Sequence, residues 1–290
     1  MRKNPLFFPF CHSEHSEESP ARLAFASAKR ADAGSPIRAR SLVVTLLGMT
    51  EILYLLGVKI DNFILSEALE QISGFFVDGR QHYIVLPYAA FLVEAQKENE
   101  FREILNKADL SLSDGVGPVI ASRVIGDEPL GGRVMGVDLI WALFAKFSAK
   151  HSFFLFGAKE GVAQEAGEKI MIKYPAAKIA GTLNGYVNDT EAITAINNSG
   201  AEILLVALGM LKQEKWIYNN LKKLPDVKIA IGVGGSFDFI SGRVRRAPRL
   251  VQKSGLEWLW RLFAQPSQWR KTWRAVVVFS WLVLKEGFKK

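Results

Sequence analysis

Short apolar runs alternate with segments of helical periodicity along most of this 290-residue chain. Six runs have the length of strands, and some are apolar at every position, as in Ile203-Leu204-Leu205-Val206. Unbroken apolar runs are typical of parallel strands that helices cover on both faces. The predicted strands are Tyr83–Leu86, Asp109–Leu112, Ser152–Phe156, Lys178–Gly181, Glu202–Leu208 and Val227–Ile231.

Amphipathic segments fill the intervals between these strands. The predicted helices are Ala89–Lys107, Gly117–Ile125, Val137–Ala149, Gly161–Lys173, Thr190–Asn198 and Lys212–Lys223. Strands that alternate with helices predict an α/β fold with a Rossmann-like, mostly parallel sheet. We place this core at residues 49–240.

The first 48 residues lack both periodicities. Residues 12–17 read His-Ser-Glu twice, and Ala, Ser, Arg and Pro dominate residues 20–40. Such a segment buries too little apolar surface to offset its chain entropy, so we expect residues 1–48 to be a disordered extension. An alternative hypothesis is that Met49 is the natural start and the upstream residues are an over-extended reading frame.

The last fifty residues, Ser241–Lys290, differ from the core in charge. They hold twelve Lys or Arg against Glu257 and Glu286, a formal charge of +10 in a chain whose total is +8. They also hold five of the seven Trp residues. Cationic side chains between indoles suit a surface of phosphates, either lipid headgroups or nucleic acid. We predict that residues 241–290 form a basic helical appendage.

Composition narrows the remaining classes. The single cysteine, Cys11, excludes an intramolecular disulfide and fits a reducing compartment. A spanning helix needs about 20 apolar residues, and Thr50 and Glu51 interrupt the nearest candidate, Ser41–Val58. The sequence therefore predicts a soluble or peripheral protein.

Glycines or an acidic turn follow four of the predicted strands, at 113–115, 157, 209 and 232–235. In open parallel sheets the ligand crevice lies beyond the carboxyl ends of the strands, where glycine lets backbone amides approach a phosphate. Each glycine alone could serve only a tight turn, but four in one sheet favour a phosphate or nucleotide site. Gly209, Gly234 and Gly235 are the candidate contacts. None forms a Walker A sequence or a Gly-x-Gly-x-x-Gly that opens a helix.

Five polar side chains are candidates for chemistry at that edge. Asp114 follows an apolar strand and precedes glycines, so it could act as a general base, although Ser-Asp-Gly is often only a turn. Arg133, Gln213 and Glu214 could bind a diphosphate and a sugar, or serve as caps and surface charges. Asp238 lies between aromatic residues and could bind substrate or cap a helix.

Metal and cofactor motifs are missing from the sequence. It contains no Asp-x-Asp pair and no Cys/His cluster at metal-ligand spacing. We therefore expect neither a metal nor a cofactor. Arginine side chains would then neutralise a diphosphate in place of a metal.

From about Leu55 to Arg274 these motifs, in order, resemble the WecG/TagA/CpsF glycosyltransferases, which build bacterial surface polysaccharides and wall teichoic acid linkages. Each matching segment is weak alone, and the set is specific. The segments are Leu56-Gly57-Val58-Lys59-Ile60-Asp61, Ser113-Asp114-Gly115-Val116-Gly117, Arg133-Val134-Met135-Gly136-Val137-Asp138, Gly181-Thr182-Leu183-Asn184-Gly185-Tyr186, Leu208-Gly209-Met210-Leu211-Lys212-Gln213-Glu214, Gly232-Val233-Gly234-Gly235-Ser236-Phe237-Asp238-Phe239, Arg245-Arg246-Ala247-Pro248 and Gly255-Leu256-Glu257-Trp258-Leu259-Trp260-Arg261-Leu262.

The resemblance implies a metal-independent, inverting transfer of an N-acetylhexosamine, typically N-acetylmannosamine, from a UDP-sugar. The acceptor would be an undecaprenyl-diphosphate-linked N-acetylglucosamine on the cytoplasmic membrane face, which implies a peripheral protein, with self-association also suggested. Asp114 would be the general base, and Arg133 and Gln213 would bind donor or acceptor. Three appendage arginines would close over the diphosphate: Arg245, Arg246 and Arg261.

The chain departs from the family pattern at four positions. Leu86 and Tyr88 stand where a Thr and an Asn are usual, and Leu211 replaces a Pro. Gln268 stands where an Arg is common. These departures favour an enzyme with an altered sugar or acceptor preference.

Two other functions remain as alternatives. The first is a nucleotide-sugar-binding homologue that has lost catalysis, which the changes at Leu86 and Leu211 motivate. The second is a nucleic-acid-binding protein that uses the basic appendage. It is less favoured because the appendage aromatics, such as Trp273 and Trp281, share one face of an amphipathic helix.

Overall fold

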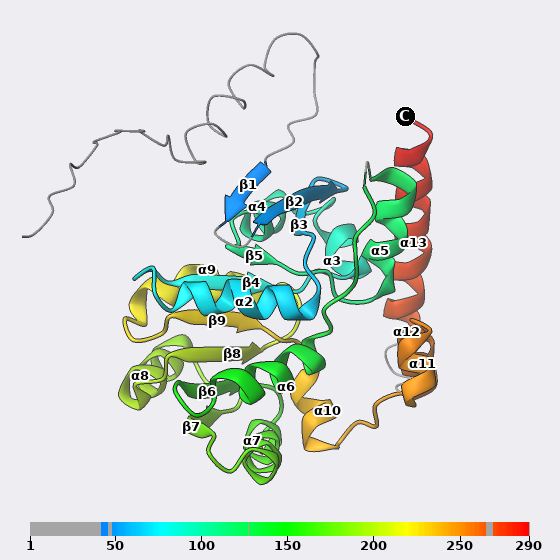
Figure 1. The fold of residues 1–290 in the computed structure, drawn as a ribbon. Helices are drawn as coiled ribbons and strands as arrows, with labels where there is room; N and C mark the ends of the chain where they lie inside the picture. Colours follow the sequence, from blue (N-terminus) through cyan, green and yellow to red (C-terminus); the bar gives the residue numbers. More distant parts are fainter. Residues whose placement is uncertain (1–41, 46–47, 127, 265–268, 290) are drawn as a thin grey trace, which may run out of the picture. The chain divides into compact units, whose positions relative to one another are not determined.

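A computed structural model of the protein describes residues 42–45, 48–126, 128–264 and 269–289 (Figure 1). All of them belong to one compact unit, Ser41–Lys290. The predicted N-terminal extension therefore lies almost entirely outside the described residues. The hypothesis that Met49 is the natural start stays a prediction.

Six parallel strands form the main sheet, in the order β5-β4-β9-β8-β6-β7. They are β4 (His82–Val85), β5 (Leu110–Ser111), β6 (Ser152–Gly157), β7 (Lys178–Leu183), β8 (Ile203–Ala207) and β9 (Ile229–Gly232). Each overlaps a run that the sequence predicted, so the α/β fold with a parallel sheet is confirmed. Because every pair is parallel, the carboxyl ends of all six strands meet at one edge.

Helices cover both faces of this sheet (Figure 1). The helices up to β9 are α2 (Leu65–Phe75), α3 (Ala89–Glu94), α4 (Asn99–Asn106), α5 (Val116–Ile125), α6 (Gly136–Phe147), α7 (Val162–Lys173), α8 (Asp189–Ser199), α9 (Lys212–Asn220) and the 3-10 helix η1 (Leu221–Lys223). The helices after β9 are α10 (Ser236–Ser241), α11 (Arg249–Lys253), α12 (Glu257–Ala264) and α13 (Trp269–Gly287).

Alternation along each strand builds two hydrophobic cores. Phe153 and Leu155 of β6 belong to the core shared with α2, α6, α7 and α10. Phe154 and Phe156, one position along, belong to the core shared with α3, α4, α5, α8, α9 and α13. Successive side chains of a strand point to opposite faces, so a strand that is apolar throughout supplies both cores.

The helix predicted over Ala89–Lys107 is divided in two. α3 ends at Glu94 and α4 begins at Asn99. The residues at the division, Gln96 to Glu100, are all polar, so no apolar side chain holds this stretch to the core. The division lets α3 pack against α13 while α4 packs against α9.

A small antiparallel sheet that the sequence did not predict precedes the main sheet. It consists of β1 (Leu42–Thr45), β2 (Gly48–Leu55) and β3 (Val58–Asp61). Leu56 and Gly57 form the two-residue turn between β2 and β3, with φ of 51° and 76°. Positive φ at both positions is the geometry of the tight hairpin turn that matches strand twist.

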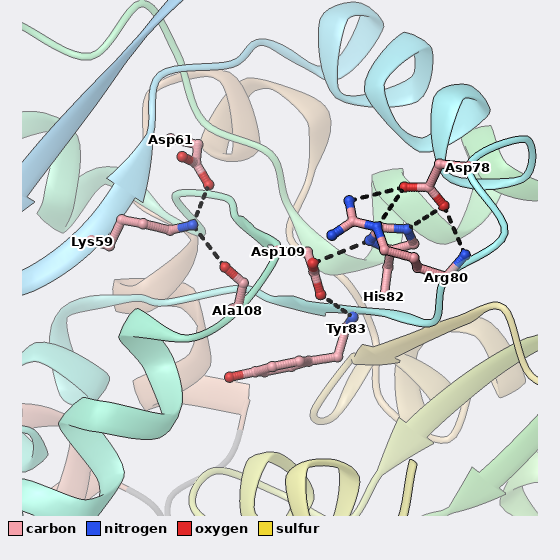
Figure 2. A network of polar contacts seen from close by, with 8 residues as sticks. All are labelled: Lys59, Asp61, Asp78, Arg80, His82, Tyr83, Ala108 and Asp109. Atoms are coloured by element: carbon pink, nitrogen blue, oxygen red, sulfur yellow. Dashed lines mark hydrogen bonds and ion pairs between the residues drawn. The ribbon is translucent and has the colours of Figure 1, made fainter. Parts of the chain in front are cut away.

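Polar contacts fasten this hairpin to β5 and to the segment that leads into it (Figure 2). The Lys59 ammonium donates to the carbonyl of Ala108 at 2.7 Å and lies 3.5 Å from Asp61. The buried Asp61 carboxylate accepts the amide of Ser111 at 2.7 Å, and Asp61 forms a bridge with Leu112. The hairpin therefore holds the end of β5, three residues before Asp114.

The C-terminal residues fold as helices, and the last of them packs on the core. α13 lies beside α3 and α5 in Figure 1 and buries Phe279 and Val283 against them. Its other face exposes Trp273, Val277, Trp281 and Leu284, and Phe288 directly after the helix is also exposed. Among the described residues, no helix combines the length and hydropathy required to cross a membrane.

Candidate active site

Asp114 lies in the loop between β5 and α5, at the carboxyl edge of the sheet. Its amide donates to the carbonyl of Pro87, after β4, at 2.9 Å. The neighbouring Ser113 carbonyl accepts the amide of Val134 at 2.7 Å. Gly115 follows with φ of 81°, a value that favours glycine, and caps α5. Two other loops thus fix the backbone around a half-exposed carboxylate.

Arg133 is brought close to Asp114 by that contact between Ser113 and Val134. Its guanidinium donates to the backbone carbonyl of Gln252 in α11. A pocket of about 400 Å³ opens beside it, lined by Arg133, Met135, Asp138, Arg249 and Gln252. Two arginines in one pocket provide the charge that an anionic ligand needs.

Gln213 and Glu214 open helix α9 at the end of β8, and both side chains are buried. The side-chain oxygen Oε1 of Gln213 accepts a hydrogen bond from the backbone amide of Gly234 at 3.0 Å, and its side-chain Nε2 donates to Glu214 Oε1 at 2.6 Å. A Cβ at Gly232 would come within 2.8 Å of Gln213, so only glycine fits under this pair. In this conformation the pair holds the β8 and β9 loops together. Its predicted role in substrate binding stays a prediction.

The environment of Glu214 changes the pKa of its carboxyl group. Burial raises the pKa of this carboxyl to about 7, although Gln213 and the amide of Leu211 oppose the shift by hydrogen bonding. The Leu211 amide donates to the Glu214 carboxylate at 2.8 Å. Besides Asp114, the site therefore contains the Glu214 carboxyl group, which titrates close to neutral pH.

Asp238 lies in α10 and is half-buried. Burial raises the pKa of its carboxyl, while the charges of Lys159 and Arg243 lower it. Arg243 itself forms a bidentate pair with Glu165 of α7, at 2.8 and 2.7 Å. This group marks the β6 and β9 side of the edge, whereas Asp114 and Arg133 mark the β5 side.

The appendage arginines have different surroundings. Arg245 is exposed. Arg246 is mostly buried, and its guanidinium pairs with Asp138 and Glu257. Arg261 belongs to α12, and its side chain lies outside the part of the chain that the structure describes. Contact of these arginines with a diphosphate stays a prediction.

The departures from the family pattern have structural counterparts. Leu86 is buried beside Gly136, and Tyr88 is 38% exposed at the start of α3. Leu211 has a φ of 73° and donates its amide to Glu214. Proline has a fixed φ near −65° and no amide hydrogen, so the usual residue could provide neither feature.

Several residues of this edge were not predicted to have a role. Asp138 and Glu257 pair with Arg246, while Arg249 and Gln252 line the pocket of Arg133. A sequence signal existed for Glu257, because it is one of only two acidic residues in the last fifty. Nothing in the spacing indicated Asp138, which is 108 positions from its partner.

The described residues include no group of three or more His, Cys, Asp or Glu side chains placed to hold a metal ion. The expectation that the reaction needs no metal stays a prediction.

A parallel α/β sheet with a carboxylate and arginines at its carboxyl edge is typical of enzymes that act on nucleotide-linked substrates. Residues 53–290 match the model of the Glycosyl transferase WecG/TagA/CpsF family. The chain belongs to this family and is a glycosyltransferase.

Two relatives of assigned activity are similar over much of the chain. One from Bacillus spizizenii is 38% identical over 180 residues, which cover 61% of this chain and 69% of the relative. One from Bacillus subtilis is 34% identical over 234 residues, which cover 79% of this chain and 90% of the relative. Both are named N-acetylglucosaminyldiphosphoundecaprenol N-acetyl-beta-D-mannosaminyltransferase.

Proposed function

We propose that this enzyme transfers N-acetylmannosamine, or a closely related N-acetylhexosamine, from a UDP-sugar to undecaprenyl-diphosphate-linked N-acetylglucosamine. The names of the two Bacillus relatives supply the sugar and the acceptor. The observation that carries the proposal is the position of Asp114, in a loop whose backbone hydrogen bonds join it to Pro87 and to Val134, the residue after Arg133. A carboxylate and a guanidinium at the edge where parallel sheets bind ligands support the roles of base and cation.

In the proposed reaction the Asp114 carboxylate accepts a proton from the acceptor hydroxyl. The freed oxygen attacks the anomeric carbon of the donor, and the bond from that carbon to the UDP oxygen breaks. A single displacement inverts the anomeric configuration. Arg133, with Arg245 and Arg261 of the appendage, stabilises the negative charge on the leaving diphosphate, so no metal is required.

We propose that α13 docks the enzyme on the cytoplasmic face of the membrane that holds the lipid acceptor. Its exposed apolar residues lie within one stripe, and α5 beside it exposes Ile120 and Val124. The Lys285 ammonium lies over the Trp281 ring at 4.9 Å, which joins a cation to an interfacial aromatic. Each basic residue near an anionic leaflet contributes about 1 kcal/mol.

A panel of UDP-sugars tests the reaction. Purified enzyme is incubated with each donor and a lipid-diphosphate-linked N-acetylglucosamine, with and without EDTA. We expect transfer from UDP-N-acetylmannosamine that EDTA does not reduce. UDP released equally with and without acceptor would contradict the proposed transfer, and loss of transfer in EDTA would contradict metal independence. No turnover with any donor would support the catalytically inactive alternative.

A further inference from the structure

One arginine of the appendage is fully occupied by contacts with the protein. Arg246 Nη1 lies 2.6 Å from Asp138 Oδ1, and Nη2 lies 2.9 Å from Asp138 Oδ2. Its Nε lies 3.4 Å from Glu257 Oε1, and Nη2 also lies 3.7 Å from the Met135 sulfur. A bidentate arginine–carboxylate pair is the strongest geometry available to these side chains.

The two carboxylates come from segments that are distant in the sequence. Asp138 lies in the first turn of α6, immediately after the loop that carries Arg133. Glu257 lies in the first turn of α12, in the appendage. The Arg246 and Glu257 side chains are 20% and 7% exposed, so water weakens this contact less than it would at an open surface. Arg246 therefore ties the start of α12 to the start of α6.

The pocket of Arg133 depends on this connection. Arg133, Met135 and Asp138 form the wall from the core, whereas Arg249 and Gln252 form the wall from α11. Gln252 also accepts a hydrogen bond from Arg133 and donates one to the Ala247 carbonyl, next to Arg246. If α11 and α12 moved away, the second wall would leave with them.

The charges around the pocket also indicate that the pocket depends on Arg246. The Asp138 carboxylate is 42% exposed and lines a pocket that also contains Arg133 and Arg249. An unpaired carboxylate there would repel a phosphate. Arg246 neutralises it and leaves the two pocket arginines to act on an anion.

We propose that Arg246 is a positioning residue: it clamps α11 and α12 of the appendage onto Asp138, completes the Arg133 pocket and does not itself contact the diphosphate. The proposal deepens the proposed function, because it takes the Arg133 pocket as part of that site. It differs from the role that the family resemblance implies for this arginine. The two roles predict different effects of removing the charge of Asp138. Activity should fall if Arg246 is a clamp, and should persist if Arg246 instead contacts the diphosphate.

The test compares Asp138→Asn, Arg246→Gln and the double variant in the full-length enzyme. The clamp requires both partners, so each single variant should lower kcat/KM between about tenfold and about 100-fold. The double variant should be no worse than the worse single variant. Since the pocket walls bind and do not react, the loss should appear mainly as a raised KM. Arg246→Lys, which keeps the charge without the fork, should recover part of the activity.

The control is Glu165→Gln, which removes the carboxylate of the other bidentate pair in this region, with Arg243. It should leave kcat/KM within about twofold, because an exposed pair contributes little. Thermal unfolding of every variant reports whether the core is still folded.

A second measurement does not depend on the substrate. Hydrogen exchange of residues 249–264 should be faster in Asp138→Asn and Arg246→Gln than in wild type or Glu165→Gln. Unchanged exchange would contradict the clamp. Wild-type kcat/KM in Asp138→Asn together with a loss in Arg246→Gln would also contradict it, and would mean that Arg246 acts on substrate. Faster exchange in an enzyme that transfers none of the sugars would support the clamp and contradict the proposed function alone.

Discussion

Glu214 shows how a single buried side chain couples the site to pH. The carboxyl is fully buried, and burial raises its pKa to about 7 from 4.5. An acid with a raised folded-state pKa keeps its proton in the native state while the unfolded chain has already lost it. The contribution of Glu214 to the free energy of unfolding therefore falls as pH rises from about 4.5 to about 7, by at most about 3 kcal/mol, and is constant above that range.

Glu214→Gln tests this coupling. The amide cannot ionise, so the variant should lose less stability than wild type between pH 5 and pH 8 in urea denaturation. At pH 5 the wild-type carboxyl is protonated, and the variant should be less stable by at most about 1 kcal/mol, because the hydroxyl oxygen of the acid can still accept a hydrogen bond from Gln213 or the Leu211 amide and the NH2 group of Gln cannot. Equal pH dependence in the two proteins would contradict the raised pKa.

A second titrating group, the carboxyl of Asp78, lies beside the buried His82 at the opposite edge of the sheet (Figure 2). The buried His82 ring stacks on Phe75 at 3.9 Å and contacts the carboxylates of Asp78 at 2.9 Å and Asp109 at 3.2 Å. Its hydrogen bond, together with the contact of Arg80, lowers the pKa of Asp78 to about 2. An acid with a lowered folded-state pKa contributes stability above its unfolded pKa and loses it below.

We therefore expect Asp78 to contribute stability that disappears as pH falls from about 4 to about 2. The difference in free energy of unfolding between wild type and Asp78→Asn should shrink across that range. Denaturation at pH 5, 3.5 and 2.5 measures it. A constant difference would mean that the contact with His82 does not favour the ionised carboxyl.

Single candidate site residues could be predicted where the local sequence around them carries the signal. Asp114 precedes a glycine at a strand end, Arg133 follows two glycines in the loop before α6, and a backbone hydrogen bond joins their neighbours Ser113 and Val134. Arg246 could be located but its partners could not, because a pair between α6 and the appendage depends on how the whole chain folds. The burial of Glu214 was also hidden, since a polar residue after a strand has the same sequence pattern whether it faces ligand or core.

Helix α13 has two faces with different functions in this account. Phe279 packs over Gly117, where an added Cβ would lie 3.4 Å from its ring. Trp281 is 57% exposed on the opposite stripe. Large-to-small substitution at a buried Phe costs about 3–5 kcal/mol, enough to release one helix that is docked by one face.

The two faces can be separated by mutation. Phe279→Ala should accelerate hydrogen exchange across residues 275–287, whereas Trp281→Ala should leave exchange unchanged and weaken co-sedimentation with anionic vesicles. If neither substitution weakens co-sedimentation, α13 is not the docking surface.

At the scale of elements, strand prediction succeeded most clearly for the inner strands β6 and β8, which are apolar on both faces. The hairpin of β2 and β3 was missed because its turn, Leu56-Gly57, requires left-handed backbone at a leucine, which propensity does not indicate. The division between α3 and α4 was missed because polar residues are also common on helix surfaces. Tertiary packing decided both.

In this account the whole molecule combines a sheet edge that holds the site with an appendage that has two proposed roles. Truncation before residue 267 removes α13 and should release the enzyme from anionic vesicles while the clamp of Arg246 persists. Truncation before residue 243 removes the clamp and α11 as well, so it should also abolish transfer to an acceptor presented in detergent. Full activity of the shorter protein would contradict any role of the appendage in the site.

The central claim is that Asp114 is the base for sugar transfer. Its most direct test is the rate of N-acetylmannosamine transfer by Asp114→Asn, with UDP-sugar binding measured on the same preparation. Removal of a general base costs about 10²–10⁴-fold in rate. We predict a loss of that size in kcat with donor affinity nearly unchanged, and wild-type turnover by Asp114→Asn would contradict the account.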